Sequence, residues 1–368
     1  MKTVKGTYTT ALVFTDHVEE YALAQIKQCC DHEAFQNCNI RVMPDVHPGK
    51  VSVIGFTSTI SEKILPNIVG IDIGCGITMA KLKQKKVEFQ KLDTVIRENI
   101  PAGSRSRRTP HRFAENLNLE ELRCFRSIQM SRVRVGIGTL GGGNHFIELD
   151  QDEQGNLYVV IHTGSRHLGK EVTEFYLSKG QEYLKGQGIS VPYELTYLEG
   201  KLMEDYLHDL QIVQEYAADN RKAILDELVK GMKWKVTEES SSVHNYVDQR
   251  DGILRKGAVS AHKDETVLIP MNMRDGILVC RGLGNREWNC SAPHGSGRIL
   301  RRDQVKEQYT VSAYRKEMKG IYSSCISKET LEEAPFAYRG IQDILGAVTD
   351  TVAVEKVLKP VYNYKAQD

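Results

Sequence analysis

Long apolar runs are missing from this chain of 368 residues. No stretch reaches the roughly 18 uninterrupted apolar residues that a membrane span requires. The N-terminal segment MKTVKGTYTTALVFTDHVEE carries charge where a signal peptide needs an apolar core. We therefore expect a globular, cytoplasmic protein with no membrane partner. Hydrophobic residues still make up 40% of the chain, which is enough for one large core.

Regular cysteine spacing and a charge of one sign are also missing. The eight cysteines are scattered, which argues against a disulfide framework and for reduced thiols. The net charge is only +1, so a nucleic-acid surface has to come from local clustering. One arginine cluster fits: Arg105, Arg107, Arg108, Arg112, Arg123, Arg126, Arg132 and Arg134. The planar guanidinium group of arginine can donate two hydrogen bonds to one phosphate, although a solvated charged face explains the cluster equally well.

Two signatures of nucleotide chemistry are absent, namely the G-x-x-x-x-G-K-[ST] phosphate loop and the Lys-x-Asp-Gly string of lysine adenylylation. Gly136, Gly138 and Gly141 match the dinucleotide fingerprint, but the following NHFIEL predicts a strand instead of the required helix. This excludes a Rossmann domain. With no internal repeat or linker, we expect one α+β domain over residues 1–368, with an excursion from the core at 178–200.

Apolar periodicity predicts the main elements. Residues at helical spacing predict helices over 16–30 and 202–232. Short β-rich runs, nearly all followed by glycine-bearing turns, predict strands over 40–43, 51–56, 133–137, 157–161 and 277–280. The turns carry the unusual residues, so we expect the functional site there.

Two glycine-rich segments carry candidate ligands. NIVGIDIGCGI (67–77) delivers Asp72 and Cys75 into a turn, where a carboxylate and a thiolate can face one cation. A small buried cysteine is the alternative. GTLGGGNHFIEL (138–149) places Asn144 and His145 after four glycines, and its strand pattern points Glu148 away from the core. The segment is typical of a loop that approaches a ligand closely.

Three further segments present histidines in turns. VVIHTGSRHLG (159–169) ends a buried strand at His162 and places Arg166 near a helix start, where anions meet arginine and free N–H groups. SVHNYV (242–247) presents His244. GLGNREWNCSAPHGSGR (282–298) surrounds His294 with small residues, and an imidazole nitrogen is a competent nucleophile toward phosphorus. Taken alone, a structural role explains His162 as well.

Seven strings occur in an order that resembles the RtcB RNA ligase family. They are MPDVHPGK (43–50), GIDIGCG (70–76), GGGNHFIE (141–148), HTGSRHLG (162–169), HNYV (244–247), RKGAVSA (255–261) and SAPHGSGR (291–298). KPVYNYK (359–365) is similar to the lysine-bearing C-terminal strand of the family. The resemblance implies an α+β fold in which mixed and antiparallel sheets are packed by helices around a central metal site.

The resemblance also implies site residues. Up to two Mn²⁺ ions would be held by Asp72, Cys75, His145, His162 and His244, with the Cys75 thiolate bridging. His294 would attack the α-phosphate of GTP and carry GMP. The guanylate would be surrounded by Asn144, Glu148, Ser296, Gly297 and Lys365, and Arg166 would hold an RNA or pyrophosphate oxyanion. The implied reaction joins an RNA 3′-phosphate or 2′,3′-cyclic phosphate end to a 5′-hydroxyl end through an RNA-3′-ppG intermediate, in RNA repair or tRNA splicing.

The choice of metal does not follow from the donor atoms alone, and three residues differ from the family pattern. A thiolate with three imidazoles favours zinc in the usual affinity order, so manganese rests on the resemblance. Gly74, Lys50 and Ser296 stand where the family usually has asparagine, an aromatic residue and often alanine, and none of these changes removes a ligand or the nucleophile. For Asp45 and His47 the resemblance leaves a structural and a direct role equally open.

Two other functions remain compatible with these residues. A metal-dependent phosphodiesterase or phosphatase for RNA ends needs the ligand cluster but no nucleotide pocket, and the string SAPHGSGR argues against it. A non-catalytic RNA-binding protein needs only the arginine cluster, which leaves the candidate ligands unexplained.

Overall fold

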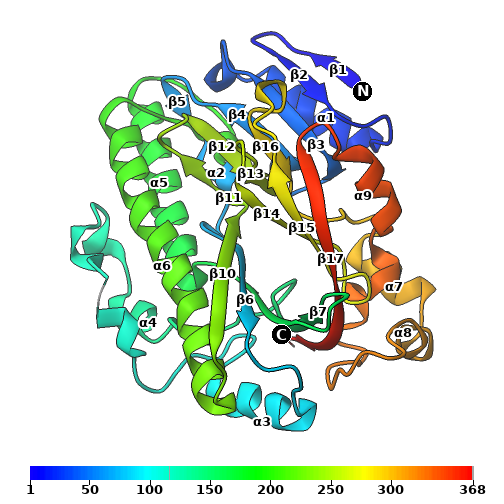
Figure 1. Ribbon diagram of the computed structural model, residues 1–368. Helices are drawn as coiled ribbons and strands as arrows, with labels where there is room; N and C mark the ends of the chain where they lie inside the picture. Colours follow the sequence, from blue (N-terminus) through cyan, green and yellow to red (C-terminus); the bar gives the residue numbers. More distant parts are fainter. Residues whose placement is uncertain (116, 367–368) are drawn as a thin grey trace.

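Two antiparallel-rich sheets and two long helices form the frame of the protein (Figure 1). The computed structural model describes residues 1–115 and 117–366. The first sheet consists, in spatial order, of β1 (Lys2–Lys5), β2 (Thr10–Val13), β3 (Ile40–His47), β4 (Ile54–Thr59), β12 (Ile253–Lys256) and β11 (Asn245–Asp248). Its β2 and β3 are parallel, so this sheet is mixed. The expected α+β class is confirmed.

The second sheet carries most of the site. Its order is β10 (Val236–Val243), β6 (Gly76–Leu82), β8 (Leu157–Thr163), β7 (Phe146–Gln151), β17 (Val352–Lys365), β15 (Ile277–Gly282) and β14 (Thr266–Pro270). Two small pairs accompany the sheets: β13 (Ala258–Ser260) with β16 (Ser291–Pro293), and β5 (Lys63–Ile64) with β9 (Leu198–Glu199). The strand β17 therefore joins β7 to β15 from the far end of the sequence (Figure 1).

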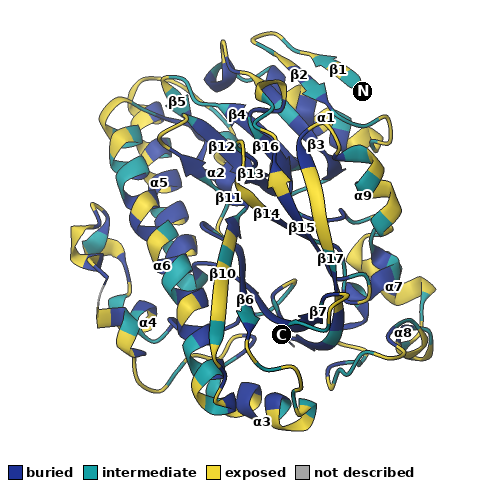
Figure 2. Cartoon of the chain, in the orientation of Figure 1, coloured by how far each residue is buried: buried dark blue, intermediate teal, exposed yellow. Residues whose placement is uncertain are grey.

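Helices cover the outside of these sheets. They are α1 (Glu20–Cys30), α2 (Pro66–Val69), α3 (Phe89–Asn99), α4 (Met130–Arg134), α5 (Arg166–Gly186), α6 (Gly200–Met232), α7 (Arg302–Gln308), α8 (Val311–Glu317) and α9 (Ile341–Ala347). Buried residues lie mainly on the strands and on the inner faces of α5 and α6 (Figure 2). None of the helices in the described part of the chain is both long enough and apolar enough to cross a membrane.

Most predicted elements are confirmed, with shifted ends. The helix expected over 202–232 is α6, and the strands expected over 40–43, 157–161 and 277–280 lie within β3, β8 and β15. The helix expected from residue 16 begins at Glu20, and the strand expected from residue 51 begins at Ile54.

The strand predicted over 133–137 is wrong, because its first residues belong to α4. The run is rich in apolar, β-branched residues, but its carbonyl groups accept hydrogen bonds from a helix side chain and a loop amide, and not from a neighbouring strand. The Tyr216 hydroxyl of α6 donates to the Val133 carbonyl at 2.7 Å, and the Arg107 amide donates to the Val135 carbonyl at 3.1 Å. Tertiary contacts override the local propensity here.

The segment 178–200 is not a separate excursion. Its first half continues α5 to Gly186, and its second half returns to pair β9 with β5. Tyr197 and Leu198 are buried in the main core. The glycine content of this segment does not indicate a loop, because glycine also occurs inside a helix where a neighbour packs closely. A Cβ at Gly180 would lie 2.6 Å from the Thr196 methyl carbon.

Two buried polar residues of α6 connect the helix to the loops of the site. The Arg221 guanidinium donates to the carbonyls of Gly74 and Thr163, at 2.8 and 3.0 Å. The Asn220 side chain accepts from the Gly138 amide at 2.8 Å and donates to the Thr139 carbonyl at 3.1 Å. Buried polar groups need such partners, and these partners are the backbones of the candidate ligand loops. The helix therefore fixes those loops relative to one another.

Candidate active site

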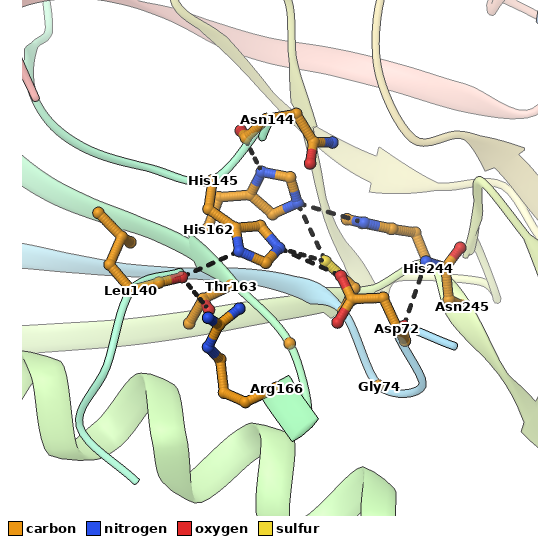
Figure 3. Close-up of polar contacts among 12 residues, drawn as sticks. Asp72, Gly74, Leu140, Asn144, His145, His162, Thr163, Arg166, His244 and Asn245 are labelled. Carbon is orange, nitrogen blue, oxygen red and sulfur yellow. Dashed lines mark hydrogen bonds and ion pairs between the residues drawn. The ribbon is translucent and has the colours of Figure 1, made fainter. Parts of the chain in front are cut away.

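Five side chains from separate segments converge in the interior (Figure 3). The Cys75 sulfur lies 3.3 Å from Nε2 of His162 and 3.5 Å from Nε2 of His145. Nε2 of His162 lies 3.3 Å from Nε2 of His244, and Nε2 of His145 lies 3.1 Å from a carboxylate oxygen of Asp72. All five are the metal-ligand candidates of the sequence, and we call them the ligand cluster. Within this cluster, the ligand atoms of Cys75, His145 and His162 all lie within 4.8 Å of one another, which is close enough to hold one metal ion.

Strand register explains the convergence. His162, the penultimate residue of β8, pairs with Ile77 of β6 on one side and with Phe146 of β7 on the other. Cys75 stands two residues before Ile77, and His145 stands directly before Phe146. Gly74 has a φ of 72°, and a Cβ there would lie 2.8 Å from the Cβ of Ala217. Any larger residue would push this turn away from α6.

Backbone carbonyls orient two of the imidazoles. Nδ1 of His145 lies 2.9 Å from the Leu140 carbonyl, and Nδ1 of His162 lies 3.2 Å from the Asn144 carbonyl (Figure 3). A carbonyl only accepts, so each Nδ1 carries the proton and each Nε2 presents a lone pair to the cluster. This arrangement is typical of metal-binding histidines.

The donor set fits a metal ion. Burial lowers the pKa of His162 and of His244 well below the usual value, so both rings are neutral. Nδ1 of His244 is buried without a hydrogen-bond partner among the described residues, so no neighbour fixes the tautomer of this ring. A cation between a thiolate, a carboxylate and three imidazoles would satisfy all of these groups. Burial, with Asp72 nearby, raises the pKa of the Cys75 thiol, and a bound metal would counteract that effect.

His294 lies next to the ligand cluster. Its ring centroid is 4.9 Å from that of His244. Nδ1 of His294 lies 2.8 Å from a carboxylate oxygen of Asp45, which is fully buried in β3. The aspartate therefore holds the proton of His294 on Nδ1 and leaves Nε2 free. Gly297 makes this approach possible, because a Cβ there would lie 2.4 Å from the Asp45 carbonyl oxygen.

A cavity of about 680 Å³ opens beside the cluster. This volume is within the usual range for nucleotide-sized ligands. The cavity is lined by Asp72, Cys75, His162, His244 and His294, and by all the residues that the sequence assigns to a guanylate: Asn144, Glu148, Ser296, Gly297 and Lys365. We call it the nucleotide cavity.

Lys365 is held in this cavity by two partners. Its ammonium group donates to the Asn144 carbonyl at 2.9 Å and pairs with the Glu333 carboxylate at 3.1 Å. Glu333 also pairs with Arg298 at 3.1 Å, and all of these groups lie within the cavity wall. Glu333 ends a short 3-10 helix (Leu331–Glu333) and has no motif around it, so the local sequence does not reveal its role.

Glu148 does not point away from the core, and this expectation is wrong. Its side chain is only 3% exposed and accepts a hydrogen bond from the Asn363 amide at 2.6 Å. Residues 147–150 of β7 are all buried, so both faces of this strand are covered and an alternating pattern does not separate core from solvent. The next residue on the same face, Asp150, is fully buried, and both of its carboxylate oxygens are without a hydrogen-bond partner.

This carboxylate pair predicts a pH-dependent stability. Burial raises the pKa of Glu148 to about 7 and the pKa of Asp150 well above its usual value. Folding therefore takes up protons, and this contribution to stability is lost as the pH rises from about 4.5 through 7. Asp150→Asn removes one carboxyl group and can donate to Glu148. We expect it to raise the free energy of unfolding at pH 8 by roughly 1–2 kcal/mol more than it does at pH 5.

Urea unfolding at both pH values tests the pair, with Asp152→Asn as the control. The Asp152 carboxylate accepts from the Asn156 amide at 2.8 Å and from the Tyr158 hydroxyl at 3.0 Å, so its removal should destabilise the protein at pH 8. Equal effects of Asp150→Asn at pH 5 and pH 8 would contradict the shared-proton interpretation.

Arg166 begins α5, as the sequence predicted. It has a φ of 54°, which is strained for an arginine. Its guanidinium donates to the Thr139 hydroxyl and to the Gly103 carbonyl, both at 3.3 Å. Gly141 leaves room for it, since a Cβ there would lie 1.9 Å from an Arg166 nitrogen. Arg166 is not in the nucleotide cavity but lines a second cavity beside Asp72 and His145.

Comparison with known proteins gives a consistent result. The family model described as tRNA-splicing ligase RtcB matches residues 25–366. The RNA-splicing ligases RtcB1 of an Escherichia coli strain and RtcB of E. coli K12 are 31% and 30% identical, each covering 88% of this chain and 89% of the relative. The tRNA-splicing ligase RtcB of Pyrobaculum aerophilum is 25% identical, covering 86% of this chain and 85% of the relative.

Proposed function

The chain belongs to the RtcB family of RNA-splicing ligases, and on this premise we propose that it is a GTP- and Mn²⁺-dependent ligase. It would join RNA 3′-phosphate or 2′,3′-cyclic phosphate ends to 5′-hydroxyl ends. The observation that carries the proposal is the position of His294. This histidine is held by a buried aspartate, stands 4.9 Å from His244 of the ligand cluster, and lines the nucleotide cavity.

His294 would act as the nucleophile. Its Nε2 attacks the α-phosphorus of GTP, the new N–P bond forms, and the P–O bond to pyrophosphate breaks. No proton has to leave the attacking nitrogen, because the proton stays on Nδ1. The ring becomes positively charged, and the Asp45 carboxylate at 2.8 Å stabilises that charge.

The ligand cluster would hold up to two Mn²⁺ ions, which supply Lewis-acid stabilisation of the phosphoryl oxygens. Cys75 contributes the thiolate, and the fixed tautomers of His145 and His162 aim their Nε2 atoms inward. Manganese is proposed from the family, since this donor set would also suit zinc.

The nucleotide cavity would position the guanylate against His294. Lys365, held by Glu333, and Glu148, held by Asn363, present fixed polar groups to it. The GMP then passes to the RNA 3′-phosphate as the bond to His294 breaks, and the 5′-hydroxyl attacks the activated phosphate and expels GMP. A cyclic phosphate is first hydrolysed to the 3′-phosphate.

The physiological setting follows from the same chemistry. We propose that one domain of residues 1–368 carries both steps, in RNA repair or tRNA splicing. The eight cysteines, Cys75 among them, are free thiols. A thiolate ligand requires a reducing compartment, which favours the cytoplasm.

Covalent labelling tests the proposal. The protein is mixed with Mn²⁺ and GTP labelled at the α-phosphate, and we expect label that survives denaturation, is lost in acid and is stable in base, as a histidine phosphoramidate is. Adding RNA with 3′-phosphate and 5′-hydroxyl ends should discharge the label and yield joined RNA. If metal-loaded protein takes no label but hydrolyses 2′,3′-cyclic phosphate ends without GTP, the phosphodiesterase alternative is correct instead.

A further inference from the structure

A second cavity reaches the ligand cluster. It has a volume of about 280 Å³ and is lined by Asp72 and His145 together with Arg166. Asp72 also lines the nucleotide cavity, so the cluster is accessible from both cavities. The smaller volume lies below the usual range for a whole nucleotide or drug-sized ligand. It is large enough for a phosphate and part of its sugar.

Basic side chains surround this second cavity. Besides Arg166 they are Arg105, Arg132 and Lys170, and Asp72 is the one carboxylate among its lining residues within the described ranges. His167 also lines the cavity, but we do not count it as a free positive charge because it is paired with Glu171 at 2.6 Å. The cavity therefore carries an excess of positive charge, which is the electrostatic environment that a phosphate group requires.

Ion pairing divides the arginine cluster of residues 105–134 into two groups. Four of its members pair with carboxylates: Arg107 with Glu227, Arg112 with Asp226, Arg123 with Asp205, and Arg134 with Glu120. The other four, Arg105, Arg108, Arg126 and Arg132, are exposed and have no ion pair within the part of the chain that the structure describes. Only Arg105 and Arg132 of these four line the second cavity. Two of the four unpaired arginines thus stand next to the ligand cluster.

The loop that carries Arg105 is fixed to the ligand loop. The Gly103 amide donates to the Gly141 carbonyl at 2.9 Å, and Ala102 forms a β-bridge with Gly141. Among the described residues, the Arg105 side chain donates to the neutral Ala102 carbonyl, at 3.3 Å, and pairs with no carboxylate. Its position is therefore tied to the loop that presents His145, while its charge is not neutralised.

We propose that the second cavity binds phosphate groups of an RNA strand next to its reacting end, with Arg105 and Arg132 as the phosphate-binding residues. The RNA identity rests on the proposed function. That reaction needs a phosphate-bearing strand at the ligand cluster while the nucleotide cavity holds the guanylate, and the second cavity is the other access to the cluster. Arginine forks bind successive backbone phosphates without reading sequence.

RNA affinity of a double variant tests the proposal. Arg105→Ala/Arg132→Ala is compared with Arg108→Ala/Arg126→Ala, which removes the two unpaired arginines outside the cavity. Binding of a 3′-phosphate oligomer and of a 5′-hydroxyl oligomer is measured separately by fluorescence anisotropy over a range of salt. We expect the first variant to bind about tenfold more weakly, with a salt slope reduced by about 2, and the control to change less than about twofold.

The two oligomers identify the strand. Loss confined to the 3′-phosphate oligomer assigns the cavity to that strand, and loss confined to the 5′-hydroxyl oligomer assigns it to the other. Unchanged affinity of the first variant, or equal loss in both variants, would overturn the proposal. Urea unfolding midpoints show whether each variant is folded. If the wild type binds RNA through these arginines but takes no GTP label, the ligase proposal fails and the cavity proposal stands.

Discussion

Replacing His294 with alanine is expected to abolish covalent GMP attachment while leaving the metal content unchanged. The loss should be on the order of a thousandfold or more, because no other side chain can replace a removed nucleophile. The neighbouring His244 is turned toward the ligand cluster, where its Nε2 lies 3.3 Å from that of His162. Label retained on denatured protein measures the effect, and elemental analysis measures the metal. Acid-labile GMP on the alanine variant would disprove the nucleophile assignment.

Asp45→Asn is the matched variant for this experiment. It keeps the His294 ring but replaces the buried carboxylate that stands 2.8 Å from Nδ1. Without a negative charge to stabilise the charged ring, labelling should slow by about 10- to 100-fold and should not disappear. A variant as inactive as His294→Ala would indicate that Asp45 mainly supports the fold.

Replacing Cys75 with alanine should remove the metal and every step that depends on it. The sulfur lies 3.3 and 3.5 Å from two imidazole nitrogens, and alanine offers no thiolate in its place. We expect labelling and RNA joining both to fall on the order of a thousandfold or more. Bound Mn²⁺, measured by electron paramagnetic resonance, gives a readout that does not require activity.

Cys280→Ala is the control for this variant, since Cys280 is a buried cysteine in the core of β15, away from the cluster. It should retain its metal.

The metal affinity of the wild type should depend on pH. Because burial raises the pKa of the Cys75 thiol, metal and proton compete for the sulfur, and the Mn²⁺ affinity should rise with pH. Full metal binding by Cys75→Ala, or metal affinity independent of pH, would contradict the thiolate ligand.

The candidate site residues are visible in the local sequence, whereas the groups that hold them are not. Asp72, Cys75 and the three histidines stand in glycine-rich or polar turns that are recognisable one by one, and the fold brings them together. Their supports lie far away in the chain. Asp45 and His294 are 249 positions apart, and nothing local links them. Glu333 pairs with Lys365 from a short 3-10 helix that carries no motif.

The same distinction applies to the fold. Helical periodicity predicted α6, but the pattern did not indicate that its polar Arg221 would face inward and bond to Gly74 and Thr163. An alternating pattern misplaced Glu148, because β7 is covered on both faces. Local patterns record which residues are apolar, whereas burial of a polar residue depends on partners that only the tertiary structure supplies.

The position of β17 has a consequence for synthesis of the protein on the ribosome. This strand lies between β7 and β15, which are separated in sequence from it and from each other (Figure 1). Until residues 352–365 are made, β7 and β15 are open edges with unpaired backbone groups, and such edges promote aggregation. A nascent chain that already contains every candidate metal ligand and His294 therefore remains prone to aggregation until β17 closes the sheet.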